Sequence, residues 1–290
     1  MDRRTALALL AAGTAGASAA LPVPAGAATN GAAARRAPAF DPTDQRQLAL
    51  AFRKLAWSAD DQVSFWWMRG TRYGVQGSVA TPFWDMYVAA WFTTRDTGDG
   101  TYEVKLTGAN FYTPVGRDTL LEKFDNPYTG KTIDVPYGRP RASVTQYDLK
   151  GGSPFGGKIP GMKSTLGSDI GPAWVEGDEI GINGDLMLHA EPEQPGPGRR
   201  TLTVNDWSTY VGSLREVMDP AVRNPAAMQT FVDVLDFPAW LQMGDTPGTF
   251  VSRCYARKVK SYAAMPATWR RHFEAKFPDL AQDPGALVRF

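Results

Sequence analysis

The stretch "TPFWDMYVAAWFTTRD", Thr81 to Asp96, decides the predicted fold. Aromatic and β-branched residues dominate it, and the turn sequence "DTGDG" at 96–100 begins at its last residue. A second strand-like run, "TYEVKLTG", starts at Thr101. Two such runs joined by a glycine-containing turn are typical of a β-hairpin. The chain is therefore predicted to build its core from antiparallel strands.

The same pattern continues on both sides of this hairpin. One strand-like run precedes it, "VSFWWMRG" at 63–70, and several follow it: "TLLEKF", "TIDV", "SVTQYDL", "DEIGINGDLMLHAE", "RTLTVND" and "GTFVSRCYARKVKS". Two further segments, "STYVGSLREVM" and "AAMQTFVDVL", fit either a helix or a strand. Many strands without regular helices between them predict a mainly β fold, an antiparallel curved sheet or a lipocalin-like barrel.

Helices are predicted at the two ends of this β-rich region. The N-terminal helix is predicted to start at Asp41, which can cap it, with Pro42 at its first position, and to end near Trp57. Apolar residues between these limits recur at three- and four-residue spacing. The C-terminal helix is "ATWRRHFEAKF" at 267–277, because its three large aromatic side chains fall on one stripe with charges opposite.

Two glycine-containing segments are predicted to be a turn and a loop. "DNPYTGKTIDVP" at 125–136 contains the end of a phosphate-binding motif, but that motif requires glycine where Asp125 stands. Pro127 and Gly130 instead favour a tight turn between two strands. "GGSPFGGKIPGMKSTLGSDIGP" at 151–172 contains glycine and proline too often for a regular element, so we expect a long surface loop there.

The first residues resemble an export leader. Arg3 and Arg4 precede an apolar stretch, and "AGA" at 25–27 has the small-residue pattern of a signal-peptidase site. The predicted parts are a cleaved twin-arginine leader at 1–27, a flexible tether at 28–40 and a single β-rich domain at 41–290. A general secretory signal is the alternative. The expected location is secreted, periplasmic or in the cell envelope, with the twin-arginine export machinery as a partner during secretion.

Composition and charge narrow the function classes. The chain has 290 residues, 43% hydrophobic and 21% charged, which is typical of a soluble protein with a substantial core. Removal of the leader takes away two arginines and one aspartate, so the formal charge of +1 falls to zero. A neutral protein has no electrostatic reason to bind nucleic acid or anionic lipid. Glycine and proline interrupt the apolar stretch of the leader, so no permanent membrane span is expected.

Sequence templates for common enzymes do not match this chain. "GGSPF" at 151–155 has Phe155 where a nucleophile elbow requires glycine. The two histidines, His189 and His272, are not spaced as a pair of metal ligands, and no C-x-x-C or H-E-x-x-H motif is present. No G-x-G-x-x-G motif follows a strand. We therefore predict no metal and no cofactor, and we expect His272 to lie at the surface.

His189 is the first candidate for catalysis. On a strand over 185–191, Asp185 and His189 share the polar face, and the apolar residues share the other. If the polar face lines a lumen, His189 beside an aspartate has the chemistry of a general base with a pKa near neutrality. If that face meets solvent, the histidine is incidental. Tyr87 is the second catalytic candidate, again with an aspartate.

Aromatic residues are the second functional signal. Trp66 and Trp67 occupy opposite faces of one strand, so that strand is buried on both sides or one ring lines a cavity. In the cavity interpretation, rings hold a flat or apolar ligand and polar groups orient it. The predicted ligand-binding residues are Trp66, Trp67, Arg69, Tyr73, Trp91 and Arg253. A carbohydrate site on exposed tryptophan faces is the variant.

Three segments of the chain form a recognisable combination: "NPYTGKTIDVP" at 126–136, "PAWLQMGDTPG" at 238–248 and "RKVKSYAAMP" at 257–266. Together they resemble the domain-of-unknown-function family 1838, and the resemblance would cover about 41–284. It implies an exported bacterial protein, and it implies no activity, cofactor or catalytic set. Lys131 departs from the acidic residue expected after the turn glycine.

The sequence thus supports three hypotheses of different classes. The first is an exported β-barrel-like protein, monomeric or weakly associating, that binds a small, largely apolar or aromatic molecule in an aromatic-lined cavity. The second is a metal-independent lyase, isomerase or cyclase in the same scaffold that uses a histidine or tyrosine with an aspartate. The third is a carbohydrate or cell-envelope binding module.

Overall fold

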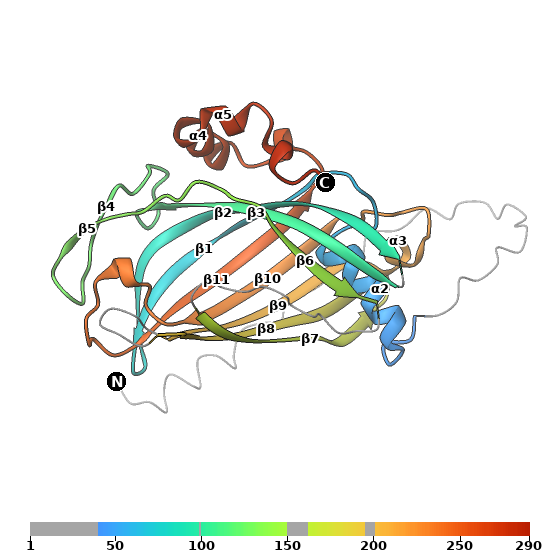
Figure 1. The fold of residues 1–290 in the computed structure, drawn as a ribbon, viewed down its shortest axis with the longest axis horizontal. Helices are drawn as coiled ribbons and strands as arrows, with labels where there is room; N and C mark the ends of the chain where they lie inside the picture. Colours follow the sequence, from blue (N-terminus) through green and yellow to red (C-terminus); the bar gives the residue numbers. More distant parts are fainter. Residues whose placement is uncertain (1–39, 99, 150–161, 195–200) are drawn as a thin grey trace, which may run out of the picture. The chain divides into compact units, whose positions relative to one another are not determined.

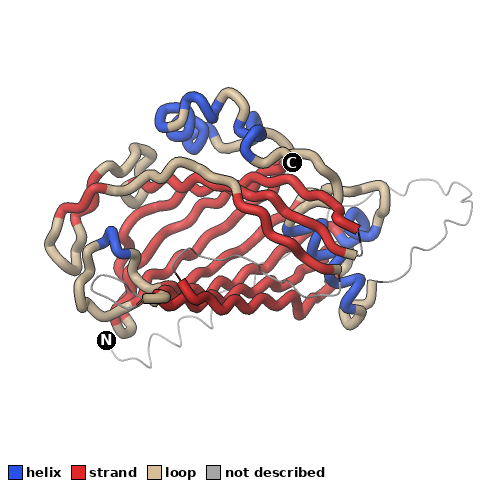
Figure 2. Tube along the Cα trace, in the orientation of Figure 1, coloured by secondary structure: helices blue, strands red, loops and turns tan. Residues whose placement is uncertain are grey.

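The computed structural model describes residues 40–98, 100–149, 162–194 and 201–290, all within one compact unit, Ala39–Phe290. The predicted leader and nearly all of the predicted tether lie outside the described residues. Within this unit the chain is mainly β, and nine strands form a single curled sheet in which every neighbouring pair is antiparallel (Figures 1 and 2). The predicted fold class is therefore confirmed.

The elements have the following bounds. In spatial order the strands are β6 (Ser143–Asp148), β3 (Thr101–Thr113), β2 (Val79–Gly98), β1 (Ser64–Gln76), β11 (Thr249–Val259), β10 (Ala227–Leu235), β9 (Leu202–Ser213), β8 (Glu179–Pro192) and β7 (Met162–Glu176). A separate hairpin pairs β4 (Lys123–Asp125) with β5 (Thr132–Asp134). The described helices are α2 (Gln45–Ala56), α3 (Leu214–Met218), α4 (Ala267–Lys276) and α5 (Pro278–Ala281). Short 3-10 turns are η1 (Ala239–Leu241), η2 (Tyr262–Ala264) and η3 (Pro284–Leu287).

The hairpin that the opening stretch predicts is the pair β2 and β3. Gly98 and Gly100 have φ values of 85° and 75° in the connecting turn, which is the backbone region that glycine enters without steric cost. After an irregularity between Asp96 and Gly98, the two strands stay in register down to the pair Asp85 and Thr113. These long paired strands form the middle of one half of the sheet.

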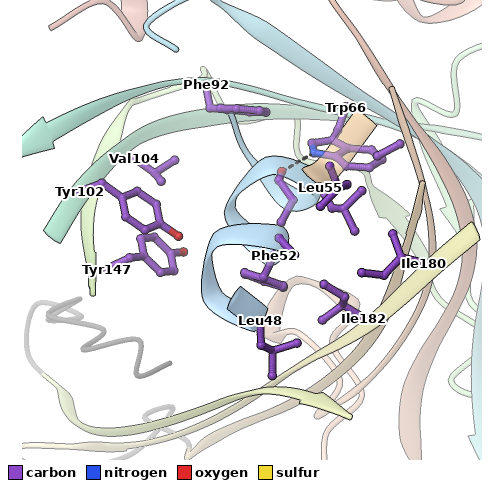
Figure 3. Packing of buried hydrophobic residues seen from close by; sticks show 14 of the residues in the cluster. Leu48, Phe52, Leu55, Trp66, Phe92, Tyr102, Val104, Tyr147, Ile180 and Ile182 are labelled. Carbon is purple, nitrogen blue, oxygen red and sulfur yellow. Dashed lines mark hydrogen bonds between the residues drawn. The ribbon is translucent and has the colours of Figure 1, made fainter. Parts of the chain in front are cut away.

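The N-terminal helix α2 packs against one face of the sheet, which we call the inner face. Its apolar stripe of Leu48, Phe52 and Leu55 contacts inward side chains from strands on both sides of the curl, as Figure 3 shows. The helix begins later than predicted, because Asp44 rather than Asp41 is the cap and accepts hydrogen bonds from the backbone N–H groups of the first turn. The helix fills part of the space that a barrel would enclose.

The opposite, outer face of β1, β2 and β3 is covered by the C-terminal segment that contains α4. Trp91 and Phe111 point from the sheet into this layer, where they meet Trp269 and Phe273 of the helix. The central strands are therefore buried on both sides. This explains the adjacent tryptophans of β1, since Trp66 packs inward and Trp67 lies on the outer face.

One end of the curl is closed by loops. The β4–β5 hairpin and η1 pack on Trp84 and Phe250, and Asn126 fixes them together by donating from Nδ2 to the Leu241 backbone oxygen at 3.0 Å. Gly130, at φ 67°, accommodates the turn between β4 and β5. The "NPYTG" segment is thus a hairpin turn, as predicted.

One segment differs from its sequence-based prediction, and the structure assigns two others that the sequence left ambiguous. Residues 162–172, within the predicted surface loop, belong to strand β7; its remainder, 151–161, lies outside the described residues. Pro172 is tolerated because it stands at a bulge of an edge strand, where no ladder hydrogen bond is lost. The ambiguous segment at 208–218 is a strand followed by a helix, and the one at 226–235 is strand β10.

Candidate functional site

A cavity of about 240 Å³ lies between α2 and the inner face of the sheet, and we call it the inner chamber. Its walls come from α2, β3, β6, β8 and β9, so it lies between the two ends of the sheet order. An apolar cavity of about 150 Å³ is known to accept benzene. The inner chamber therefore has room for a single ring with substituents.

Four aromatic side chains stand in the walls of the inner chamber. Phe52 of α2 meets Tyr210 of β9 edge-to-face, with ring centroids 5.3 Å apart. On the opposite wall Trp57, at the end of α2, packs against Tyr147 of β6 at 5.9 Å. Ligand pockets are typically apolar and aromatic with a few placed polar groups. The inner chamber has this composition.

The polar side of the inner chamber is on β9. Asp206, Ser208 and Tyr210 alternate along this strand and all line the chamber. Ser208 and the Tyr210 hydroxyl both accept hydrogen bonds from Gln229 Nε2, at 2.9 and 3.1 Å. Asp206 differs, because its Oδ1 atom is buried without a hydrogen-bond partner in the described structure.

Asp206 stands directly opposite Asp233 of β10, and the two carboxyl groups have different environments. Asp233 Oδ1 accepts from Arg72 Nη1 at 2.7 Å and from the Ser252 backbone N–H at 2.7 Å. Burial, together with the Asp233 charge, raises the pKa of Asp206 to about 7. Near neutral pH, the Asp206 carboxyl therefore retains its proton for part of the time.

A second cavity, of about 250 Å³, lies on the outer face beside the start of α4, and we call it the outer pocket. It brings together three residues of the predicted site, Trp67, Arg69 and Tyr87. The Arg69 guanidinium lies over the Tyr87 ring, 4.8 Å from its centroid. The Tyr87 hydroxyl donates to Asp118 Oδ1 at 2.5 Å, so the predicted pairing of this tyrosine with an aspartate is present.

The titration of the groups around the outer pocket follows from their burial. Burial, with the hydrogen bond to Asp118, raises the pKa of Tyr87 to about 12, so this hydroxyl keeps its proton at neutral pH. His272 contacts the same loop, with Nε2 3.0 Å from the Asp118 backbone oxygen. It is buried, and burial lowers its pKa; the expectation that His272 lies at the surface is wrong. His272 points inward because it stands next to Phe273 on the side of α4 that packs on the sheet.

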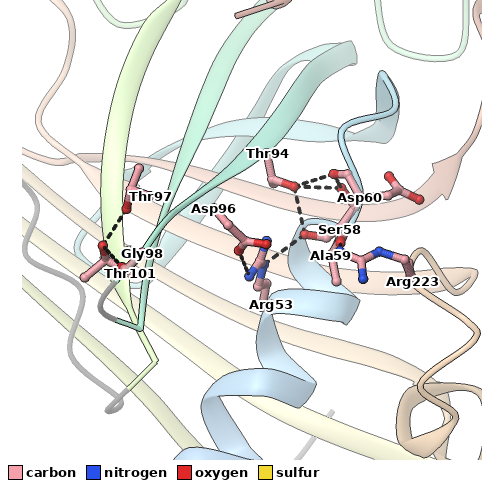
Figure 4. A network of polar contacts seen from close by, with 10 residues as sticks. All are labelled: Arg53, Ser58, Ala59, Asp60, Thr94, Asp96, Thr97, Gly98, Thr101 and Arg223. Atoms are coloured by element: carbon pink, nitrogen blue, oxygen red, sulfur yellow. Dashed lines mark hydrogen bonds and ion pairs between the residues drawn. The ribbon is translucent and has the colours of Figure 1, made fainter.

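A wide cleft of about 770 Å³ at the far end of α2 contains many charged and hydroxyl side chains, and Figure 4 shows part of their hydrogen-bond network. Four arginines line it, and each donates to an acceptor of the protein: Arg53 to Asp96, Arg95 to Glu103, Arg223 to the Ala59 backbone oxygen, and Arg289 to Asp283. Thr94 and Ser58 add further bonds within this network. The four arginines of this cleft are therefore already paired with acceptors of the protein.

The catalytic candidates on β8 are not in an enclosed lumen. His189 alternates onto the outer face, opposite to the inward Ile180 and Ile182, and 52% of its side chain is exposed. Its partners are Glu191, at 3.3 Å, and the Thr203 hydroxyl. This corrects the lumen placement of His189. Asp185 belongs to the rim of the inner chamber, but its side chain shares the outer face of β8 with His189.

The remaining predicted ligand-binding residues are dispersed. Trp66 is buried in the inner core, where its Nε1 donates to the Ala56 backbone oxygen at 2.8 Å. Trp91 is buried in the outer core and donates to the Pro284 backbone oxygen. Tyr73 is half-buried on the outer face of β1, and Arg253 is exposed on β11. Of the predicted set, Trp67, Arg69 and Tyr87 share a cavity, the outer pocket.

Sequence reasoning missed the residues that line the inner chamber, Asp206 above all. A usable signal was present in "LTVNDWSTY" at 202–210, where alternate positions run Leu, Val, Asp, Ser, Tyr. An aspartate that continues the apolar alternation of a strand points to the same side as the core residues before it. Trp57 carried no signal, because its place depends on where α2 ends.

Exposed tryptophans do not form a continuous row on the described surface. Trp174 and Trp207 are both about half exposed on the outer face. Their partners on β8 are Gly181 and Asp185, which are four residues apart along that strand. At roughly 3.3 Å per residue, this separates the two rings by about 13 Å along the strand direction alone. The geometry gives the carbohydrate variant no flat platform of adjacent rings.

Within the described residues, no helix is long and apolar enough to cross a membrane. Comparison of the chain with protein-family models, with curated proteins and with solved structures finds no match.

Proposed function

We propose that this protein binds a small, largely apolar or aromatic organic molecule in the inner chamber. The observation that carries the proposal is the lining of this partly open cavity: four aromatic side chains line a space of about 240 Å³, and Asp206 and Ser208 line it from β9. Burial of a ring in such a space contributes about 25 cal/mol for each Å² of apolar surface removed from water. The affinity would come from this burial and the orientation from the polar wall.

Filling the inner chamber is the direct test. Thr145 lines it from β6, whereas its neighbour Val144 is exposed. We expect Thr145→Trp to abolish a bound mass that native mass spectrometry detects on the wild-type protein purified from its exporting host. Val144→Trp, which adds the same ring outside the chamber, should retain that mass. An equal bound mass on both variants, or none on the wild-type protein, would contradict the proposal.

The same spectrum tests the proposed export. We propose that residues 1–27 are removed by the twin-arginine route and that the mature chain is secreted, periplasmic or held at the cell envelope. A chain mass that still includes these residues after export would argue against that processing.

A specific observation also favours a second candidate, an acid–base enzyme at the outer pocket. The Tyr87 hydroxyl is bonded to Asp118 and stays protonated at neutral pH, so it can act as a general acid toward a molecule seated beside Trp67 and Arg69. This candidate supports the lyase or isomerase hypothesis with Tyr87 in place of His189.

Hydrogen–deuterium exchange into a panel of small enolisable ketones would test this candidate. We expect Tyr87→Phe to lower the exchange rate by about 10²-fold, since general acid catalysis contributes roughly that much or more. Tyr73→Phe, which alters a half-buried tyrosine of the same outer face, is the matched control and should leave the rate unchanged. Equal rates for the wild-type protein and Tyr87→Phe would remove Tyr87 from the mechanism.

A further inference from the structure

Two residues that line the inner chamber each carry a buried polar atom that has no hydrogen-bond partner in the described structure. One is the indole N–H of Trp57, whose Nε1 atom is buried. The other is the Asp206 carboxyl, whose Oδ1 atom is buried. Buried polar groups in native proteins are nearly always paired, and each unpaired group costs free energy. Two such groups in one small cavity point to a ligand that supplies their partners.

The two groups stand on different walls of the inner chamber. Trp57 follows α2 and packs against Tyr147 of β6 and Phe92 of β2, whereas Asp206 belongs to β9. An indole N–H only donates a hydrogen bond, so its partner must be an acceptor. A ligand between these walls therefore needs an acceptor oxygen near Trp57 and a group near Asp206 that matches the protonation state of the carboxyl.

The surroundings of Asp206 favour a neutral carboxylic acid in this position. Asp233 already accepts hydrogen bonds from Arg72 and from the Ser252 N–H, and burial together with the nearby Asp233 carboxyl disfavours a charge on Asp206. The titratable and charged groups around Asp206 are Asp185 of β8, Asp233 of β10, Arg72 of β1, Cys254 of β11, Tyr210 of β9 and Tyr147 across the chamber. Arg72, the cation of this group, is bonded to Asp233. A protonated carboxyl donates one hydrogen bond, again to an acceptor.

We infer that the inner chamber selects small, neutral, single-ring molecules that carry acceptor oxygens, such as ketones, quinones or lactones, which Trp57 and Asp206 hold by hydrogen bonds. This inference rests on the proposed function, and it adds the class of ligand and the two residues that determine it. Carboxylates are disfavoured, because a buried anion needs a paired cation and no lysine or arginine is among the described residues that line the chamber. Hydrocarbons of the same shape are disfavoured, because they would leave both donors unpaired.

Two probes of matched shape separate these alternatives. Acetophenone and α-methylstyrene have the same ring and the same branching, and they differ in a carbonyl oxygen against a methylene group. We expect Trp57→Phe and Asp206→Leu each to weaken acetophenone binding about tenfold relative to α-methylstyrene, which is the loss of one neutral hydrogen bond. Asp206→Asn should retain acetophenone binding, since the amide still donates. Isothermal titration calorimetry gives the Kd values, and circular dichroism confirms that each variant is folded.

The pH dependence provides a second, independent readout. The pKa of Asp206, about 7 in the folded protein and roughly 3.9 in an unfolded chain, means that the folded state holds this proton over the interval between them. Stability of the wild-type protein relative to Asp206→Asn should therefore fall as the pH rises from about 4 to 7 and stay constant above that. Acetophenone binding should weaken as the pH rises through 7 in the wild-type protein and stay level in Asp206→Asn.

The possible outcomes distinguish failure of the inferred ligand class from failure of the proposed function on which it rests. If both probes bind and all variants keep the same ratio of Kd values, the proposed function stands and the hydrogen-bonding selection is wrong. If the relative stability does not vary between pH 4 and 7, Asp206 is not the neutral donor. If neither probe binds the wild-type protein at millimolar concentration, while Thr145→Trp still removes a co-purified mass, the inferred ligand class is wrong. The inner chamber then remains the binding site. If neither probe binds and no mass co-purifies, both fail.

Discussion

Replacing Arg72 with methionine is expected to lower the free energy of unfolding by about 3–5 kcal/mol. Arg72 and Asp233 form an ion pair at 2.7 Å inside the curl, and their side chains are only 12% and 11% exposed. Removal of the arginine leaves Asp233 buried with a charge that only the Ser252 N–H stabilises. It also removes the guanidinium from the face of Phe250, whose ring centroid lies 4.4 Å away. Urea denaturation would show the loss as a lower midpoint with an unchanged slope.

A double variant separates the charge from the packing in this prediction. Arg72→Met combined with Asp233→Leu removes both partners and fills the site with apolar groups of similar volume. Such replacements of buried ion pairs are often neutral or stabilising, so we expect the double variant to regain most of the lost stability. A double variant as unstable as the single one would show that the interior depends on the guanidinium's packing and not on its charge. A single variant within about 0.5 kcal/mol of the wild-type protein would refute a buried, desolvated pair.

The ion pair also illustrates what sequence patterns can and cannot reveal. The alternation in "VSFWWMRG" and "TPFWDMYVAAWFTTRD" predicts β1 and β2 correctly, because a half-buried or doubly buried strand imposes its period on the residues of the strand itself. The partner of Arg72 is 161 residues away, on β10. Strand order, which places β11 between β1 and β10, is a long-range property that no local period encodes.

The same limit separates the predicted site from the observed one. Period two correctly places His189 and Asp185 on a common face of β8, but it does not determine which face is inside. That choice depends on α2, which packs against Ile180 and Ile182 and so turns the polar face outward. Asp206 was overlooked for the converse reason, since "ND" at 205–206 resembles the start of a turn while the strand continues to Ser213.

Replacing Trp91 with alanine is expected to lower the free energy of unfolding by about 3–5 kcal/mol, the usual range for removal of a buried tryptophan. Trp91 has no exposed surface, and it joins the sheet to the C-terminal segment. Its ring contacts Phe273 and Trp269 with centroids 5.5 and 6.1 Å away, and its Nε1 donates to the Pro284 backbone oxygen at 2.8 Å. Thermal and urea denaturation followed by circular dichroism would measure the change.

Trp207→Ala is the matched control, because this tryptophan lies on the outer face of β9 with 46% of its surface exposed. We expect its effect to be within about 0.5 kcal/mol, which is usual for surface positions. Hydrogen exchange then determines how the C-terminal segment is attached. If the segment is an integral layer of the fold, Trp91→Ala should raise exchange rates both in α4 and in β2, because α4 and β2 shield each other from solvent. If only α4 exchanges faster and β2 is unaffected, the segment is a detachable cap, and the outer pocket at its start would open without unfolding of the sheet.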